Sequence, residues 1–198
     1  MRALASPSRF HGAIENAASD ERSRKLWRID QLNGKQYLMI LSEMEINWES
    51  VAEQFGKTGV RVEEKNYDVL LERITVGSKW HFRLRANPTI SKKKETGQMT
   101  RGKVIAHITE EHQKNWLLEK SERNGFSINE NEFFVTEQKW YSFYKGNEAH
   151  HHRVRLLAVT YEGILTVTDV SAFQKALTSG IGREKAYGMG MLTIVSGG

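Results

Sequence analysis

The order of strand and helix signals along the chain restricts its fold more than any single motif does. The second half carries six signals in the order strand, helix, strand, strand, helix, strand, and the first half carries the same series without the opening strand. This order is typical of ferredoxin-like units. The sequence therefore predicts an α+β protein with tandem ferredoxin-like (RRM-like) βαββαβ domains, the first lacking its opening strand. Residues 1–76 would form one domain and residues 77–198 the other.

In the first half, Pro7 and a helical spacing of apolar residues predict a helix over residues 3–18, with Ser6 as its N-cap. The runs LWRID and KQYLMILS flank Asn33-Gly34, a dipeptide that favours a tight hairpin turn. A helix through NWESVAEQF, ended by Gly56, and a strand through GVRVEEK complete the unit.

In the second half, an alternating apolar pattern predicts a strand from Trp80 to Ala86, ended by Asn87-Pro88. Thr109 is expected to cap a helix that ends at Gly125. The remaining predicted elements are a strand over residues 132–140, a strand pair over 153–168 turning at Glu162-Gly163, a helix over 169–179 and a strand over 189–195.

Composition excludes several classes of chemistry. There is no cysteine, so disulfides, thiolate zinc sites and a cysteine nucleophile are ruled out. No apolar run approaches the roughly 18 residues needed to cross a bilayer, and residues 1–20 lack the apolar middle of a signal peptide. We therefore expect a cytoplasmic protein without membrane contact. A formal charge of +5 favours a polyanionic partner.

Basic residues gather in two segments that could contact a polyanion. One is the loop SKKKETGQMTRGK, and the other is a strand in which alternate residues share a face. A charged run is most often a solvated face, so these segments alone do not identify a partner. The candidates are Lys92, Lys93, Lys94, Arg101 and Lys103 in the loop, and Arg153 and Arg155 in the strand.

The stretch GIGREKAYGMGML follows the last predicted helix and precedes the last strand. A dinucleotide-binding loop has the reverse context, and no Gly-Lys-Ser or Gly-Lys-Thr of a P-loop is present. Two interpretations stay open: a helix end with a turn, or a backbone that approaches a phosphate chain closely. The second assigns phosphate contacts to Gly180, Gly182, Arg183, Lys185, Gly188 and Gly190.

Five segments in this order, RFHGAI, LWRID, FRLRANP, TYEGILTVTD and GIGREKAYGMGML, resemble the Cas6e (CasE) branch of the CRISPR RNA-processing endoribonucleases. The resemblance covers nearly the whole chain. It implies that the glycine-rich loop binds RNA and that repeat RNA is cleaved at the base of its stem-loop without metal, leaving a 2′,3′-cyclic phosphate. It also implies that the product stays bound beside other Cascade subunits, and that no cofactor is used.

The resemblance assigns the catalytic role to His11. Histidine suits proton transfer because its ordinary pKa lies near neutrality, although a lone helix histidine is otherwise most often structural. Some relatives have a tyrosine three residues earlier, where this chain has Ser8, so the second catalytic group is undetermined. Arg9 and Lys185 are candidate cations for stabilising charge on the phosphate.

The tract His150, His151 and His152 is not interpreted as a metal site. Adjacent residues of an extended chain point to opposite faces, so three consecutive histidines converge poorly on one ion. A solvated loop is the preferred interpretation, and no metal site is expected.

Two other functions stay open. A non-catalytic RNA-binding subunit of the same kind of complex would keep the RNA clamp and lose the catalysis. A generic two-domain RNA-recognition protein would carry an aromatic RNP motif, which FRLRANP and TYEGILT do not supply. Because the family's first domain opens with a strand before the histidine helix, we also expect this chain to be an N-terminally shortened form with a less stable first domain.

Overall fold

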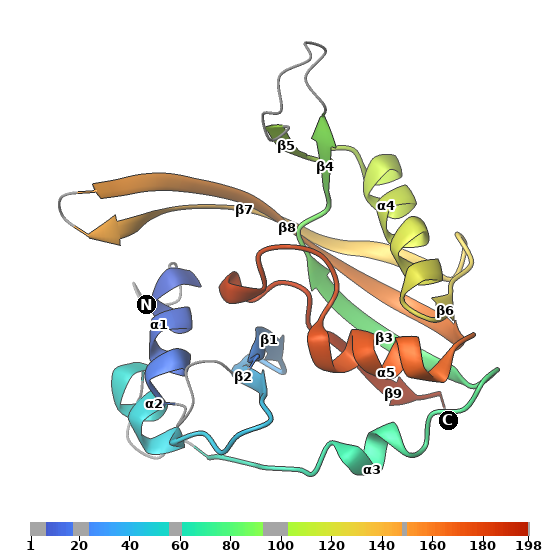
Figure 1. Ribbon diagram of the computed structural model, residues 1–198, viewed down its shortest axis with the longest axis horizontal. Coiled ribbons are helices and arrows are strands. Elements are labelled where there is room, and N and C mark those ends of the chain that lie inside the picture. The colour runs from blue at the N-terminus through green and yellow to red at the C-terminus, as the bar shows by residue number, and fades with distance from the viewer. Residues whose placement is uncertain (1–6, 18–23, 56–60, 93–102, 148–149, 198) are drawn as a thin grey trace.

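The computed structural model describes residues 7–17, 24–55, 61–92, 103–147 and 150–197. Its largest feature is an antiparallel sheet in the second half, in which strands run in the spatial order β7, β8, β3, β9 (Figure 1). With the helices between them, these strands give the ferredoxin-like order expected from the sequence. The bounds are β3 Lys79–Ala86, α4 Glu110–Arg123, β7 Phe133–Asn147, β8 His150–Val167, α5 Val170–Ser179 and β9 Leu192–Ser196.

The two faces of this sheet have different roles, and β3 shows why. Trp80, Phe82, Leu84 and Ala86 are buried, whereas the residues between them are at least partly exposed. The buried set packs with apolar side chains of α4 and α5, which cover one face of the sheet. The opposite face carries Arg83 and Arg85 and lines a cleft toward the first half of the chain.

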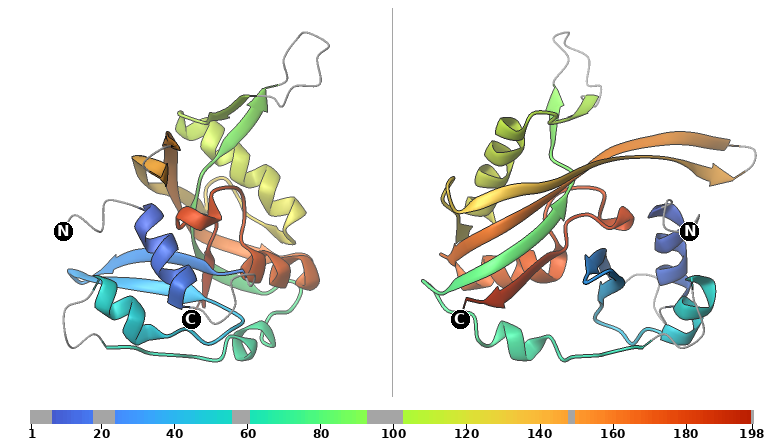
Figure 2. Two further views of the ribbon diagram at one scale, coloured as in Figure 1. Left: turned by 60° about the vertical axis from the view of Figure 1, so that its left-hand side comes forward. Right: turned by 180° about the vertical axis from the view of Figure 1, so that it is seen from behind.

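The first half consists of α1 (Pro7–Ala17), a hairpin of β1 (Leu26–Leu32) and β2 (Lys35–Leu41), α2 (Trp48–Phe55) and the short α3 (Asp68–Leu71). Asn33 and Gly34 both have positive φ, as a tight hairpin turn requires. Phe10 and Ile14 of α1 pack on Trp27 of β1. Figure 2 shows α1 and α2 lying side by side next to this hairpin.

A buried arginine joins the two halves. The guanidinium of Arg28 in β1 donates to both carboxylate oxygens of Asp30, at 2.8 and 2.7 Å. It also donates to the backbone oxygens of Arg83 in β3 and Met191, and to the hydroxyl of Thr193 in β9. Because every one of these acceptors is fixed by a strand or its end, the hairpin is held against β3 and β9 in one orientation.

One predicted strand pair and one predicted strand are wrong. Residues 153–168 do not form a strand pair, because β8 continues through Gly163, which pairs with Phe133. A β carbon at position 163 would lie 2.2 Å from the backbone oxygen of Glu132, so the glycine permits a close approach instead of a turn. The predicted strand GVRVEEK is also absent over residues 61–65, which are exposed and pair with no strand among the described residues.

The basic loop and the histidine tract also differ from their predictions. Part of the loop forms a hairpin of β4 (Thr89–Lys92) and β5 (Lys103–Ala106), in which Lys92 pairs with Lys103. The backbone of the histidine tract belongs to β8 instead of a loop. Ser6 and the position of an opening strand lie outside the described residues. No helix in the described ranges is long and apolar enough to span a bilayer.

Candidate functional site

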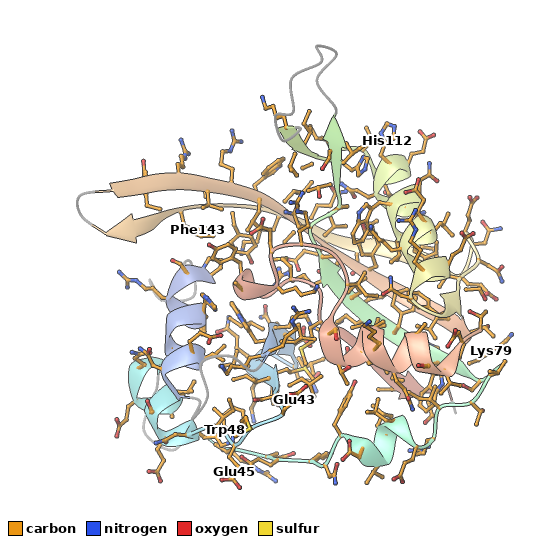
Figure 3. The ribbon with its side chains drawn as sticks, viewed as in Figure 1. Glu43, Glu45, Trp48, Lys79, His112 and Phe143 are labelled. Atoms are coloured by element: carbon orange, nitrogen blue, oxygen red, sulfur yellow. The ribbon has the colours of Figure 1, made fainter. Side chains whose placement is uncertain are left out.

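His11 lies where α1, the glycine-rich loop and the β7–β8 hairpin meet. Its imidazole is edge-on to the ring of Tyr187, with ring centroids 6.3 Å apart. Tyr187 in turn packs edge-on against Phe143 of β7, at 4.8 Å. Figure 3 shows Phe143 pointing from the hairpin toward the short helix η2 (Lys185–Tyr187). These contacts fix the surroundings of His11 from three separate parts of the chain.

A carboxylate lies on one side of the His11 ring. Nδ1 of His11 is 3.7 Å from Oε1 of Glu15, one helical turn later, and Oε2 of Glu15 is 3.1 Å from the buried Nζ of Lys25. The 3.7 Å separation exceeds a hydrogen bond, so Glu15 acts on the histidine through charge and position. The His11 side chain remains 37% exposed. An imidazole held on one side and open on the other can exchange a proton with a bound ligand.

The glycines of the loop have intramolecular reasons to be glycine. Gly180, Gly182, Gly188 and Gly190 all have positive φ, the region that other residues rarely adopt. A β carbon at Gly188 would lie 2.9 Å from the indole of Trp27, and one at Gly190 would lie 2.6 Å from the Ile181 oxygen. The loop is therefore built by close internal packing, and its contact with RNA stays a prediction.

The two basic residues of the loop differ in their surroundings. Lys185 folds along Gly180 and Gly190, and burial, with a smaller contribution from the charge of Arg24, lowers its pKa below the ordinary value. Arg183 is exposed and lines a small cavity of about 300 Å³ together with Lys120, Trp116 and β4. Arg183 is thus directed toward solvent, whereas Lys185 belongs partly to the loop's own packing.

A polar cleft of about 470 Å³ lies beside His11. Pro7 and Phe10 of α1 and Tyr187 form the end nearest to the histidine. Its walls are the β1–β2 hairpin on one side and the uncovered faces of β3, β7 and β8 on the other. The cleft therefore runs from the candidate catalytic helix into the space between the two halves of the chain.

Other predicted RNA-binding residues lie around this centre. Arg9 is exposed on α1, but it precedes His11 by two positions, so the two side chains leave different faces of the helix. Arg153 and Arg155 share one exposed face of β8, where Arg155 lies 5.3 Å from the centre of the Trp140 ring. Lys103 is exposed in β5. Lys93, Lys94 and Arg101 lie outside the described residues.

Sequence reasoning missed Glu15, Lys25, Tyr187 and Arg85. Glu15 had a usable signal, because residues four apart face each other on a helix. The other three come near the site only through tertiary contacts. Among the residues described, no three histidine, aspartate or glutamate side chains form a group that could hold a metal ion.

Comparison with known proteins agrees with this geometry. The family model described as CRISPR associated protein matches residues 1–195. The CRISPR-associated endoribonuclease Cse3 of Thermus thermophilus is 28% identical over 98% of this chain and 92% of its own length. A solved structure of CRISPR endoribonuclease Cse3 bound to a 19-nucleotide RNA superposes with a TM-score of 0.75 at 25% identity, covering 98% of this chain and 92% of the other.

The fold is shared more widely. The CRISPR-associated protein Cas6e of Escherichia coli K-12 superposes with a TM-score of 0.56 at 21% identity, covering 98% of this chain and 94% of its own. These matches confirm the resemblance and the fold class inferred from the sequence. The chain belongs to the CRISPR associated protein family.

Proposed function

We propose that this protein is a metal-independent endoribonuclease that cleaves CRISPR repeat RNA at the base of its stem-loop and then retains the mature RNA. The observation that carries the proposal is His11, which is partly exposed, is flanked by Glu15 and Tyr187, and follows Phe10, a residue that lines the polar cleft. The endoribonuclease name of the Thermus thermophilus relative and the RNA bound in the related Cse3 structure support it.

The chemistry needs only groups that this chain supplies. Attack by a ribose 2′-oxygen on the adjacent phosphorus forms a 2′,3′-cyclic phosphate and breaks the bond to the 5′-oxygen. The 2′-hydroxyl proton must be accepted and the leaving oxygen must receive one, and an imidazole can do either. Because Glu15 lies on the Nδ1 side of His11, Nε2 is the nitrogen that faces the RNA. Arg9 or Lys185 would stabilise the charge that develops on the phosphate.

Binding of the stem would depend mainly on phosphate contacts. The deep major groove of A-form RNA is hard for side chains to read, so cations near the backbone dominate. The basic residues assigned to this surface include Arg153 and Arg155 on β8, Lys103 on the β4–β5 hairpin and Arg183 of the glycine-rich loop. Lys92 is assigned to it from the sequence. The mature RNA would stay bound to this protein, and the other Cascade subunits would assemble on the same RNA.

The test uses the repeat from the source genome as a labelled stem-loop and analyses the ends of the product. We expect a 5′-hydroxyl on one fragment and, on the other, a phosphate that resists phosphatase until acid opens the ring. A substrate with 2′-deoxyribose at the cleavage position should bind and remain intact. Cleavage of that deoxy substrate would overturn the mechanism. Binding without cleavage of the unmodified RNA would instead favour the non-catalytic subunit, which the Ser8 substitution leaves open.

A further inference from the structure

The cleft beside His11 contains a buried donor that the protein itself does not satisfy. The Arg85 side chain is only 13% exposed, and its terminal nitrogen contacts Oε2 of Glu137 at 3.2 Å. Its Nε, by contrast, is buried without a hydrogen-bond partner among the described residues. A buried guanidinium N–H without an acceptor is costly, so an oxygen atom that entered the cleft at this point would be bound favourably.

An aromatic ring lies next to this donor. The guanidinium carbon of Arg85 is 5.8 Å from the centre of the Tyr141 ring, and Nζ of Lys139 is 5.3 Å from the same centre. All three side chains line the cleft. An aromatic face beside two cations is the combination by which proteins hold unpaired nucleotides, with the base stacked on the ring and the phosphate near the cations.

The carboxylates of the cleft do not cancel this positive charge. Asp30 accepts hydrogen bonds from Arg28, and Glu162 accepts them from Arg83 and from the Thr136 hydroxyl. Glu137 is the carboxylate that forms an ion pair with Arg85, and its side chain is 52% exposed. An arriving phosphate that displaces Glu137 into solvent gives up its contact with Arg85 and a long hydrogen bond from the Thr160 hydroxyl, at 3.5 Å.

The size and position of the cleft fit one nucleotide near the reaction centre. Its volume of about 470 Å³ lies in the range of roughly 300–1,000 Å³ that is usual for small-ligand sites. Pro7, Phe10 and Tyr187 connect it to the helix and ring that surround His11. An RNA strand whose phosphate lies at His11 can continue directly into it.

We propose that this cleft is a subsite for one unpaired nucleotide flanking the repeat stem, with its base against Tyr141 and its phosphate on Arg85. The subsite rests on the proposed RNA substrate and adds recognition of the single-stranded flank. The walls combine aromatic rings with the cations Arg28, Arg83, Arg85 and Lys139, which favours RNA over an apolar protein segment.

The experiment compares two RNAs that share one stem-loop, of which only one carries the single-stranded flank. Both have 2′-deoxyribose at the cleavage position, so that binding is measured without cleavage. The wild-type protein should bind the flanked RNA more tightly. Arg85→Gln should remove about tenfold of the affinity for the flanked RNA, the loss expected for a charge-assisted hydrogen bond, and leave the stem-loop affinity unchanged. Lys139→Gln should also lower the affinity for the flanked RNA, by a smaller factor.

Arg123→Gln is the matched control, because it removes one exposed positive charge from α4, on the helix-covered side of the sheet. It should leave the ratio of the two affinities unchanged. If Arg85→Gln lowers the melting temperature, the exposed Lys139→Gln variant decides the question. Equal affinities of the wild type for both RNAs, or equal losses on both RNAs in a folded variant, would overturn the subsite.

Failure of the subsite and failure of the proposed function give different results. If the unmodified RNA is cleaved normally and the flank does not change RNA affinity, only the subsite proposal is wrong. Flank-dependent binding without cleavage removes the catalytic proposal and keeps the subsite. If Arg85→Gln binds both RNAs normally but fails to assemble with partner subunits, the cleft is a protein-docking surface and the nucleotide proposal is wrong.

Discussion

The indole of Trp27 lies directly against Gly188, and its Nε1 donates a hydrogen bond to the backbone oxygen of Ala186 at 3.2 Å. This contact connects β1 of the first half to the glycine-rich loop of the second. It also places the loop next to α1, because Phe10 packs on the same indole, with ring centroids 5.5 Å apart. The loop thus holds the histidine helix in place through one tryptophan.

Gly188→Ala should destabilise the protein, because the added β carbon meets the Trp27 ring and φ is +78°. A left-handed conformation costs about 1–2 kcal/mol for a residue with a β carbon, and the contact with the ring adds to this. Gly12→Ala is the control. Its β carbon would meet nothing within 4 Å, and in a helix it should stabilise by roughly 0.5–1 kcal/mol. Denaturant unfolding measures both, and equal stabilities would contradict the packing role of Gly188.

Arg28→Met should lower the free energy of unfolding more than Gly188→Ala does. The substitution leaves the carboxylate of Asp30 buried with only the longer contact to Arg83, at 3.6 Å. Removing one partner of a buried ion pair typically costs about 3–5 kcal/mol. The double variant Arg28→Met, Asp30→Leu should recover part of this loss, since no unpaired charge remains. A double-mutant cycle by denaturant unfolding measures the coupling. A double variant less stable than the sum of the single variants would contradict this account.

The sequence predicted those parts of the fold that local patterns determine. The alternation from Trp80 to Ala86 identified β3 and its buried face, and Thr109 caps α4 by accepting from the backbone nitrogen of His112, as predicted. Asp169, predicted as the first residue of α5, is instead its N-cap. Gly163 was misread, because a glycine marks a turn and a close strand approach equally well. Only the pairing partner Phe133 distinguishes the two.

The site was less predictable for a similar reason. The resemblance singled out His11, but its packing against Tyr187 and the ion pair between Glu15 and Lys25 depend on how distant segments meet. Arg28 is a charged residue that a sequence places at the surface, yet it is 2% exposed. Its burial follows from acceptors on β3 and β9 that no local pattern reveals.

His11→Ala should reduce cleavage by about 10²–10⁴-fold, the usual contribution of a proton-transfer group, and leave stem-loop affinity nearly unchanged. A group that acts mainly in the transition state affects the rate and not the binding. Glu15→Gln should lower the rate less, because it removes the charge beside Nδ1 and keeps the shape. Single-turnover cleavage and equilibrium binding measure the two effects. Parallel losses in both would make His11 a structural residue.

Cleavage should persist in EDTA, because the proposed reaction uses side chains alone for proton transfer. The measurement is the single-turnover rate with and without the chelator at constant ionic strength, since salt alone changes RNA affinity. The His11→Ala protein in the same buffers controls for contaminating nucleases. Activity that disappears with EDTA and returns with magnesium would contradict the mechanism.

Replacing Lys92, Lys93 and Lys94 with alanine should weaken RNA binding at low salt and flatten its dependence on salt. Each lysine that contacts a phosphate releases counterions when RNA binds, so each one lost should reduce the slope of log K against log salt by up to about 1. The control replaces Lys65, Lys79 and Lys175, three exposed lysines elsewhere on the chain, and so removes the same net charge. If charge alone attracts the RNA, both triple variants will flatten the slope equally. If the first three contact phosphates, only their removal will change it, and an unchanged slope would show that they do not touch the RNA.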